Sequence, residues 1–505
     1  MPLPDLIEIV PLEKPVHAEI TVPGSKSITN RALILAALAE GEVTLEGALW
    51  SEDTQIMVEC LQELGFMVDV RPDPNEDCNR TITVYGKGGA VPSGGTEQQP
   101  VELFVGNAGT AARFLAAFVC LGKGVYRLHG VPRMHERPQA ALFKALRELG
   151  YRVESEQEME RLPARIWGGE EVSSSRSQVS GSALKRSCQV SIEQSSQFAS
   201  ALLLCAKIGG WNIEVVGENA EESPYVVMTS KLIEVFPHHG GKFQIEPDAS
   251  SGSYFWGAGW IAPAPIFQRS ESDNEKLQQI FAMVAKNPEL NAELGAILRE
   301  DTPYFKWWTR MPELVGRTGA ESGRWLREMK SRHSLVGVRQ WPSSNWQIDE
   351  KFPSGGRGFP LISRKHDLGD SIMTSIALAP LESEAVCFTD LGRLRVQECE
   401  RVVALRTELT KCGAKVIEEG DTLAVYPSQL HGAEIETYND HRMAMCFAIL
   451  GLKVPGIKIK NPACVKKTFP NFFQKLAAAP PKGLGATILD AKTGRSLTHE
   501  ELFAD

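Results

Sequence analysis

Two cations at the start of a small-residue segment are the first side chains in this chain that could do chemistry. Residues 23–31 read P-G-S-K-S-I-T-N-R, which places Lys26 and Arg31 near the start of a helix that Ser25 or Ser27 can cap. The free N–H groups at one helix end stabilise an anion by about 0.3–1 kcal/mol, whereas a hydrogen bond to a charged group contributes about 1.5–3 kcal/mol. We therefore predict an anion site in which the cations dominate binding. This segment alone leaves a capped surface helix as the alternative.

Five later segments carry similar side chains. They are residues 106–113 (G-N-A-G-T-A-A-R), 132–138 (P-R-M-H-E-R-P, read as a loop), 393–401 (R-L-R-V-Q-E-C-E-R), 438–445 (Y-N-D-H-R-M-A-M) and 466–470 (K-K-T-F-P). The first is not a Walker A loop, because the sequence has no G-x-x-x-x-G-K-[ST]. A charge run is usually a solvated face, but these runs recur at matching places in a repeat.

The repeat predicts the elements that must position these residues. Polar clusters open six helices of small apolar residues, near positions 26, 110, 195, 251, 370 and 440, and a short strand follows each. A second helix type leads into a Gly-led strand at residues 57–70, 142–153 and 402–416. A repeat determines the architecture before function is considered. If the copies converge, many helix ends form one large anion site.

The bulk composition is that of an ordinary globular protein. With 505 residues, 43% of them hydrophobic, the chain can form two or more domains. The net charge of −9 argues against general nucleic-acid binding but allows locally gathered cations to bind small anions. No apolar run approaches the roughly 18–20 residues of a membrane span, and the start of the chain lacks signal-peptide features. The ten cysteines form no C-x-x-C pair, which favours a cytoplasmic location without disulfides or zinc.

Two segments lie outside the repeat. The long spacing between the fourth and fifth copies predicts an insertion within residues 262–322, interpreted as a peripheral surface elaboration, with a partner-binding module as the alternative. Residues 477–505 begin A-A-A-P-P-K-G and are expected to be a C-terminal extension that is partly ordered at best.

Taken in order, these segments resemble the 5-enolpyruvylshikimate-3-phosphate synthases (3-phosphoshikimate 1-carboxyvinyltransferases), a family of enolpyruvyl transferases. The similarity runs from about residue 7 to 476, interrupted by the insertion. Its motifs are P-G-S-K-S-x-x-N-R, N-A-G-T-A, E-R-P, S-S-Q-F, D-A-S-S-x-S-Y-F and Y-N-D-H-R-M-A-M. The resemblance implies an α/β fold of two similar domains, each of three βαβαββ repeats (an inside-out α/β barrel). Residues 1–22 with 246–505 would form one domain, which holds the insertion, and residues 23–245 the other, with crossovers near residues 22–24 and 245–248.

The resemblance also implies the reaction. The enolpyruvyl group of phosphoenolpyruvate would pass to the 5-hydroxyl of shikimate 3-phosphate with release of phosphate, on the shikimate pathway to chorismate and aromatic amino acids. Addition followed by elimination needs no metal or organic cofactor. These two small molecules are the expected partners of a monomer, with no nucleic-acid or membrane partner.

Matched motif positions imply roles for individual residues. Shikimate 3-phosphate would be held by Lys26, Ser27, Arg31, Ser195, Ser196, Gln197, Tyr225, Asp370 and Gln397. Phosphoenolpyruvate would be held by Lys26, Gly109, Arg137, Gln197, Arg401, Arg442 and Lys467. The implied catalytic residues are Asp370, Glu398 and Lys26.

The chemistry agrees with two separate carboxylates. Adding an alcohol to an enol ether needs a base for the hydroxyl, which matches Asp370, and a proton for the methylene carbon, which matches Glu398. We expect neighbouring cations to keep Asp370 ionised. We expect a more apolar setting to leave Glu398 protonated part of the time.

Several positions depart from the family pattern. Gln397 stands where the family commonly has Lys, and Arg393 stands where an Asn is usual. Glu222 occupies a position often held by Ser, with Ser223 one place on, and Phe114 replaces a common Pro. One hypothesis is that Arg393 supplies the charge missing at Gln397.

Two alternative interpretations of the function remain open. UDP-N-acetylglucosamine enolpyruvyl transferase shares the fold and the donor, but it carries a reactive loop Cys and an early Lys-Asn pair. Here Lys26 lies in Ser-Lys-Ser, and the loop with Arg133 and Arg137 has no Cys. A catalytically inactive relative that acts as a binding protein is the second reading, which Gln397 keeps open.

Overall fold

The computed structural model describes residues 3–156, 160–169, 186–217, 223–262, 335–339, 344, 346–355 and 357–504. The insertion expected within residues 262–322 lies outside these ranges except for its first residue. Glu222 lies outside them as well.

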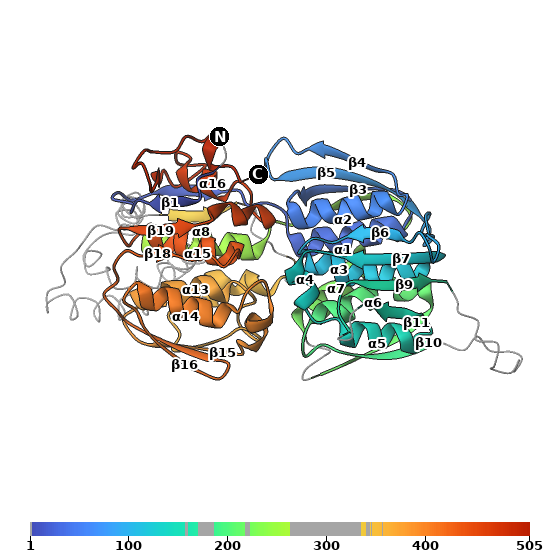
Figure 1. Cartoon of the computed structure of the whole chain (residues 1–505). Helices are drawn as coiled ribbons and strands as arrows, with labels where there is room; N and C mark the ends of the chain where they lie inside the picture. The colour runs from blue at the N-terminus through green and yellow to red at the C-terminus, as the bar shows by residue number, and fades with distance from the viewer. Residues whose placement is uncertain are drawn as a thin grey trace, which may run out of the picture.

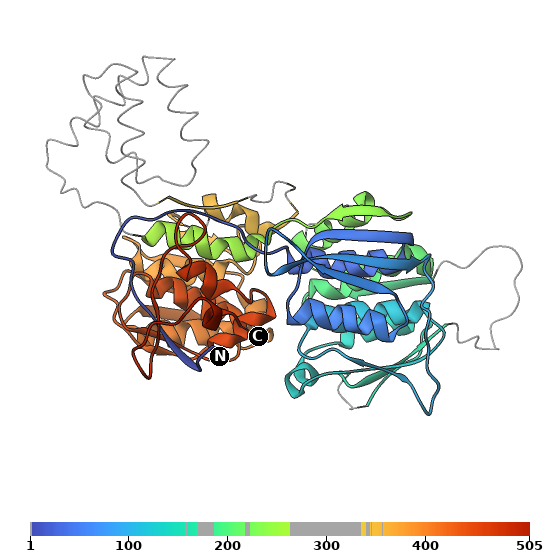
Figure 2. The same ribbon diagram turned by 90° about the horizontal axis from the view of Figure 1, so that it is seen from above.

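The described residues form two lobes that lie side by side (Figures 1 and 2). The hydrophobic core of lobe 1 is built from residues 28–245. The core of lobe 2 is built from residues 3–22 together with residues 254–504, and both chain ends lie on this lobe (Figure 1). Lobe 1 is therefore inserted into the sequence of lobe 2.

The chain passes between the lobes twice, and the two passages lie against each other. Gly24 and Pro247 form an isolated antiparallel bridge. The Ser25 N–H donates to the Glu246 carbonyl at 2.7 Å, and the Asp248 N–H donates to the Pro23 carbonyl at 2.9 Å. A Cβ on Gly24 would lie 2.0 Å from the Gly47 carbonyl oxygen, so this close approach requires glycine.

Each lobe contains one βαβαββ repeat that is continuous along the chain. In lobe 1 it comprises β6 (Val101–Phe104), α3 (Gly109–Phe118), β7 (Gly124–His129), α5 (Ala140–Glu148), β8 (Val153–Ser155) and β9 (Ala164–Gly168). In lobe 2 it comprises β14 (Leu361–Ser363), α13 (Ile372–Leu378), β15 (Val386–Thr389), α14 (Arg401–Lys411), β16 (Lys415–Glu419) and β17 (Thr422–Tyr426). The two sheets have the same strand order, β6-β7-β9-β8 and β14-β15-β17-β16, and the same parallel first pair.

Other repeats borrow a strand from elsewhere in the chain. In lobe 1, β12 (Gly241–Gln244) joins a sheet with β3 (Glu40–Leu49), β5 (Asn79–Lys87) and β4 (Val68–Pro72). In the chain, α1 (Lys26–Leu38) precedes β3, and α2 (Glu52–Glu63) lies between β3 and β4. In lobe 2, β1 (Leu6–Ile9) lies between β19 (Ile457–Lys460) and β20 (Ile488–Asp490), and β18 (Glu434–Ile435) and α15 (His441–Gly451) precede β19.

Two further sheets have two strands each among the described residues. The first pairs β10 (Arg186–Ser191) with β11 (Trp211–Val216). In the chain, α6 (Ser196–Gly209) lies between these two strands and α7 (Pro224–Val235) follows β11. The second pairs β2 (His17–Ile20) with β13 (Leu335–Val338), on either side of α8 (Ala249–Ile261) in the chain. The six sheets thus match the six copies predicted from the sequence.

The small-residue helices lie at the centre of the lobes, and the sheets lie outside them (Figure 1). All ten residues of α3 are buried, as is every residue of α1 from Ile28 onward. A helix that is apolar on all sides must be surrounded by protein. By contrast, α5 buries one face, through Leu142, Phe143, Ala145 and Leu146. This arrangement is the predicted α/β fold of two similar lobes with helices inside.

The expectation of a poorly ordered C-terminal extension is wrong. β20 pairs with β1 in antiparallel register, with Ile9 opposite Ile488. Leu502 and Ala504 are buried, and Arg495 forms an ion pair with Glu501 at 2.8 Å. The Ala-Pro-Pro-Lys-Gly composition predicted a loop, but the apolar residues beyond it complete the core of lobe 2. None of the described helices is both long enough and apolar enough to cross a bilayer.

Candidate active site

The N-terminal ends of all six small-residue helices open onto one cavity between the lobes. Each helix start contributes at least one lining residue, namely Lys26, Thr110, Ser196, Ser250, Asp370 and Arg442. Three of these ends are capped by a side chain: Ser195 accepts from the Gln197 N–H, Asp248 from the Ser251 N–H and Asp440 from the Arg442 N–H. The predicted convergence of helix ends is confirmed, and the free N–H groups make the cavity favourable for anions.

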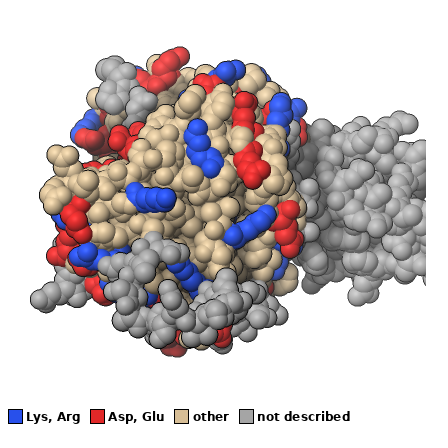
Figure 3. Space-filling model, turned by 90° about the vertical axis from the view of Figure 1, so that its right-hand side faces the viewer, with Lys and Arg blue, Asp and Glu red and all other residues tan. Residues whose placement is uncertain are grey.

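Positive charge is concentrated in this cavity although the chain as a whole is acidic. Eight lysine or arginine side chains line it, against four aspartate or glutamate side chains, while the chain carries a net charge of −9. On the outer face of lobe 1, by contrast, basic and acidic side chains are interspersed over the described surface (Figure 3). The cations are therefore gathered locally, as the sequence predicted.

The structure brings almost all predicted site residues together. Thirteen of the fifteen line the cavity: Lys26, Ser27, Arg31, Arg137, Ser195, Ser196, Gln197, Tyr225, Asp370, Gln397, Glu398, Arg401 and Arg442. The other two lie directly behind its wall. Lys467 contacts Glu398, and Gly109 lies beneath Arg137.

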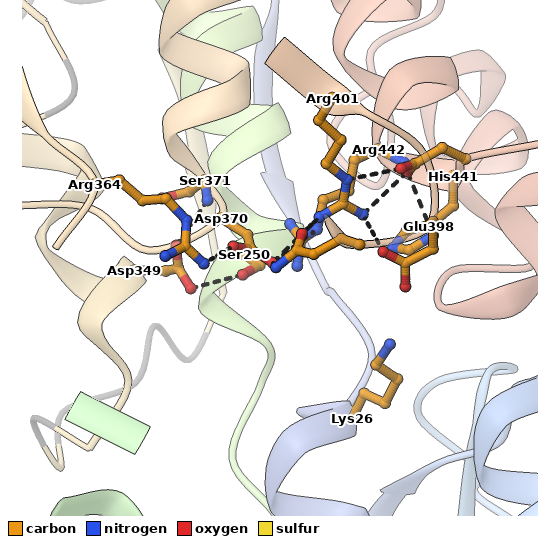
Figure 4. A network of polar contacts seen from close by, with 12 residues as sticks. Lys26, Ser250, Asp349, Arg364, Asp370, Ser371, Glu398, Arg401, His441 and Arg442 are labelled. Carbon is orange, nitrogen blue, oxygen red and sulfur yellow. Dashed lines mark hydrogen bonds and ion pairs between the residues drawn. The ribbon is translucent and has the colours of Figure 1, made fainter. Parts of the chain in front are cut away.

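Arg401 connects three carboxylates in the wall of lobe 2 (Figure 4). Its Nη2 donates to Glu398 at 2.8 Å, its Nε donates to Asp440 at 2.7 Å, and its Nη1 lies 3.4 Å from Asp370 Oδ2. The side chain is 1% exposed. A buried guanidinium with this many charged partners has one orientation, so it fixes the spacing between Asp370 and Glu398.

Cations surround Asp370 as expected. Burial favours the neutral acid, but Arg364, Arg442 and Arg401 outweigh it and hold the pKa of Asp370 below its usual range. Arg364 donates to Asp370 Oδ1 at 2.6 Å, and Arg442 Nε lies 3.6 Å from Oδ2. An ionised Asp370 can accept a proton from a hydroxyl.

The expectation for Glu398 is wrong in this structure. Burial alone would raise its pKa, but Lys467 and Arg401 lower the pKa well below the usual range of a glutamate. Lys467 Nζ is 3.2 Å from Glu398 Oε1. The sequence suggested an apolar setting, because it could not show that Lys467 folds back onto this carboxylate. The nearby His441 is 2% exposed, and burial lowers its pKa well below the usual value.

Lobe 1 contributes further cations on the other side of the cavity. Lys26 forms an ion pair with Asp53 at 2.9 Å and lies apart from the lobe 2 network in Figure 4. Arg137 donates to the Asn107 carbonyl at 3.1 Å. A Cβ on Gly109 would lie 2.5 Å from both Arg137 Nη2 and Arg113 Nη1, so glycine lets two guanidiniums cover the start of α3.

The segment expected as a Pro-bounded loop is in part a short helix, α4 (Pro132–Glu136). Pro132 occupies the first helical position, where its missing N–H costs nothing. Arg133 donates to the carbonyl of Gln397 at 3.2 Å and so contacts the opposite lobe.

Arg31 joins three helices of lobe 1. Its guanidinium donates to the Ser27 carbonyl at 2.8 Å, to Ser200 Oγ at 3.0 Å and to Thr229 Oγ1 at 2.8 Å. It also lies over the ring of Phe114, 5.2 Å from the centroid. Burial lowers its pKa to about 10. Phe114, unusual in the sequence pattern, thus packs against an arginine in the cavity wall.

Gln397 and Arg393 both face the cavity from the segment before α14. Gln397 Nε2 is 3.5 Å from Asp370 Oδ2, and its Oε1 accepts from Arg401. Arg393 donates to the Ile192 carbonyl of lobe 1. Compensation of Gln397 by Arg393 stays a prediction. Tyr225 also lines this region, and burial raises the pKa of its hydroxyl.

Sequence reasoning missed several residues of the site. Asp440 and Arg113 lie within quoted motifs, so the motifs themselves could have indicated them. Arg364 and Asp349 lie in segments without a motif, and no sequence signal pointed to them. Asp349 accepts from Ser250 Oγ at 2.7 Å and from the Ser371 N–H at 2.8 Å, joining the starts of α8 and α13. Among the described residues, no cluster of three or more His, Cys, Asp or Glu side chains could hold a metal ion.

Comparison with known proteins defines the class. The structure is similar to an EPSP synthase from Acinetobacter baumannii (TM-score 0.58, 19% identity, covering 96% of this chain and 99% of that one). It is also similar to the enolpyruvyl transferase NikO from Streptomyces tendae (TM-score 0.55, 14% identity, 99% and 100%). The chain thus has the enolpyruvyl transferase fold.

Sequence comparison gives the family. The model for EPSP synthase (3-phosphoshikimate 1-carboxyvinyltransferase) matches residues 10–237 and 360–476. A 3-phosphoshikimate 1-carboxyvinyltransferase from Trichormus variabilis is 34% identical over 491 residues, 93% of this chain and 98% of its own length. One from Opitutus terrae is 35% identical over 500 residues, 96% and 100% respectively. The chain belongs to the EPSP synthase family.

Proposed function

We propose that this chain transfers the enolpyruvyl group of phosphoenolpyruvate to the 5-hydroxyl of shikimate 3-phosphate and releases phosphate, in the cavity between its lobes. The observation that carries the proposal is the pair Asp370 and Glu398, two carboxylates that Arg401 holds in one cation-rich cavity. Each carboxylate can move one of the two protons that the reaction requires.

The donor site is assigned to the Glu398 side of the cavity. Phosphoenolpyruvate carries a phosphate and a carboxylate, and each would pair with cations. The residues proposed to hold it are Lys26, Gly109, Arg137, Gln197, Arg401, Arg442 and Lys467. The position of these residues supports the assignment, since all of them line the cavity or lie directly behind its wall.

The acceptor site is assigned to the Asp370 side. Here the ends of α1 and α6 offer hydroxyl and amide groups, and α7 offers Tyr225. The residues proposed to hold shikimate 3-phosphate are Lys26, Ser27, Arg31, Ser195, Ser196, Gln197, Tyr225, Asp370 and Gln397. Arg31 would act mainly by holding this wall together, because its donors already bond to Ser27, Ser200 and Thr229.

The first step is addition. Asp370 accepts the proton of the 5-hydroxyl as its oxygen attacks the second carbon of phosphoenolpyruvate. Glu398 delivers a proton to the methylene carbon, which becomes a methyl group. Because Lys467 and Arg401 hold the pKa of Glu398 well below its usual range, Glu398 must first gain this proton. Binding of phosphoenolpyruvate would cause this protonation, because its negative charges pair with Lys467 and Arg401 and so raise the pKa of Glu398.

The second step is elimination. Glu398, now a carboxylate again, removes a proton from the methyl group, the new double bond forms, and the carbon–oxygen bond to phosphate breaks. The proton that Asp370 took from the hydroxyl passes to the departing phosphate, so Asp370 and Glu398 both return to the protonation states in which the addition began. Lys26 and the surrounding arginines stabilise the departing phosphate. Contact between the lobes excludes water, which protects the tetrahedral intermediate from hydrolysis.

We further propose that the enzyme acts as a monomer in the cytoplasm. All six helix ends of the cavity come from one chain, so the site needs no second copy. The ten cysteines are all free thiols and mostly buried, as suits a reducing compartment.

The test is phosphate release from shikimate 3-phosphate and phosphoenolpyruvate, with UDP-N-acetylglucosamine as the control acceptor. We expect release with the first acceptor only. Glu398→Gln and Asp370→Asn preserve shape and should each lower kcat by at least about 10²-fold. Failure of the wild-type protein to release phosphate would contradict the proposal. Near-normal turnover in either variant would remove that residue from the mechanism.

A further inference from the structure

Asp370 lies between Arg364 on one side and a pair of arginines on the other, and the two sides contact different oxygens of its carboxylate. Arg364 Nη2 is 2.6 Å from Oδ1, whereas Arg401 and Arg442 approach Oδ2 at 3.4 and 3.6 Å. Figure 4 shows Arg364 on one side of Asp370 and the cluster of Arg401, Arg442 and Glu398 on the other. Arg364 is therefore the one cation of this network on the far side of the base.

The side of the carboxylate identifies the substrate that Arg364 can reach. Arg401 leads through Glu398 to Lys467, which is the side assigned to the donor. Arg364 follows β14, and Tyr225 and Arg393 lie within electrostatic range of its guanidinium. These two belong to the acceptor side of the cavity. Arg364 thus faces the substrate whose hydroxyl Asp370 activates.

Arg364 is buried but not fully bonded. Its side chain is 8% exposed and lines the cavity. Its Nε is buried and has no hydrogen-bond partner in the described structure. A guanidinium has five N–H donors, and leaving a buried donor unsatisfied costs about 1–3 kcal/mol. A bound ligand that accepts from this edge would remove that cost.

The neighbouring positions leave room for such a role. Gln397 is neutral, and Arg393 already donates to the Ile192 carbonyl of lobe 1. The backbone of Arg364 is fixed, because its main-chain N–H donates to the Thr389 carbonyl at 3.1 Å. It is the acceptor-side cation that combines a fixed backbone with an unused donor.

We propose that Arg364 is an acceptor-positioning residue: it orients the Asp370 carboxylate and donates to the group next to the attacking hydroxyl of shikimate 3-phosphate. In that substrate the neighbouring group is the 4-hydroxyl. Arg364 then supplies a positive charge on the acceptor side of Asp370, where Gln397 is neutral. This inference rests on the proposed function.

The experiment compares Arg364→Met with Arg406→Met. Arg406 is a surface arginine of the same lobe, 42% exposed and paired with Glu418, so it controls for loss of one charge. In Arg364→Met, we expect the KM for shikimate 3-phosphate to rise at least about tenfold, since a charged hydrogen bond is lost. The KM for phosphoenolpyruvate should change less than about twofold. Arg406→Met should change neither.

A pH profile separates positioning from a structural role. Without Arg364 the pKa of Asp370 should rise, so the acid limb of kcat/KM for shikimate 3-phosphate should move to higher pH. The charged and titratable groups that remain around Asp370 are Arg442 on α15, Arg401 on α14, Arg393 and Glu398 before α14, Asp349 before α13 and Tyr225 on α7. Adding Gln397→Lys to Arg364→Met should recover part of the lost affinity.

Calorimetric binding of shikimate 3-phosphate gives a readout that does not need turnover. Should the wild-type protein bind this acceptor without releasing phosphate, the proposed reaction fails, and Arg364 is still tested by the affinity. Equal rises in both KM values, or unchanged acceptor binding in Arg364→Met, would overturn the inference. If Arg364→Met does not fold, Arg364→Lys serves instead, and an unchanged acceptor KM with an unchanged acid limb would overturn it.

Discussion

Lys467 Nζ lies 3.2 Å from Glu398 Oε1 and donates, at the same distance of 3.2 Å, to the Asn107 carbonyl of the opposite lobe. One ammonium therefore controls the charge of a proposed acid/base group and contacts the other half of the molecule. Movement of the lobes relative to each other would change the environment of Glu398. We therefore expect proton transfer at Glu398 and contact between the lobes to be coupled through Lys467.

Replacing Lys467 with Met should weaken the dependence of stability on pH. Glu398 has a depressed pKa in the folded protein. It therefore contributes stability above the unfolded value of about 4.3, and that stability is lost as pH falls through the folded pKa. Lys467→Met raises the folded pKa, so the free energy of unfolding should decline less between about pH 5 and 3. Urea titrations at several pH values measure this. Exposed Lys453→Met is the control, and an equal effect in it would contradict the prediction.

Gly109→Ala should impair capture of phosphoenolpyruvate while leaving the fold intact. The new Cβ would lie 2.5 Å from the guanidiniums of Arg113 and Arg137, which can move because they are side-chain ends. Displacing the Arg137 guanidinium would weaken a charged contact worth about 1.5–3 kcal/mol, so the KM for phosphoenolpyruvate should rise roughly 10- to 150-fold. Steady-state kinetics and the thermal unfolding midpoint test both parts. An unchanged KM would show that Arg137 does not need its present position.

Arg31→Lys should destabilise lobe 1 although the charge is kept. One ammonium cannot reach Ser27, Ser200 and Thr229 together, and it also loses the contact with Phe114. We expect the free energy of unfolding to fall by about 3 kcal/mol. Urea denaturation of the full chain gives the value. A loss below about 1 kcal/mol would mean that these hydrogen bonds are individually replaceable.

An ion pair between the lobes lies close to the two chain passages. Lys475 Nζ is 2.6 Å from Glu76 Oε2 and 2.9 Å from Thr21 Oγ1, and Asn471 donates to Glu76 Oε1 at 2.8 Å. Glu76 is 4% exposed and Lys475 is 16% exposed. Lys475→Met leaves the Glu76 carboxylate buried without its cation and should lower stability by about 3–5 kcal/mol.

A double-mutant cycle tests this ion pair. Glu76→Gln with Lys475→Met should cost less than the sum of the two single changes, since neither charge is then buried alone. The cycle is read from urea denaturation of the four proteins. Additive losses would show that the two side chains are not coupled.

The sequence predicted the helix starts and the small-residue helices because those features are local. A polar cluster such as residues 195–197 or 250–253, followed by a run of small apolar residues, identifies a helix start without knowledge of its neighbours. It could not predict contacts between distant segments. Lys467 beside Glu398 and Glu76 beside Lys475 depend on how the repeats pack, and no spacing rule connects those positions.

The C-terminal segment is ordered by a distant contact that the sequence could not predict. Residues 477–483 have the composition of a loop, and the sequence alone gave no reason for the following residues to be ordered. Their order comes from β1, at the other end of the chain, which offers β20 an edge to pair with. Local composition predicts the conformation of an isolated segment, but not the order that the segment gains by pairing with a distant strand.

That pairing has a consequence for biosynthesis. β1 is made long before its partners β19 and β20. Because domains tend to fold as units during synthesis, lobe 1 can fold while β1 is still waiting for its sheet. The sheet that contains β1 can form only after β19 and β20 have been made. A chain that stops before residue 457 would therefore carry a folded lobe 1 and an incomplete lobe 2 in which both edges of β1 are unpaired. Unpaired strand edges are a template for aggregation.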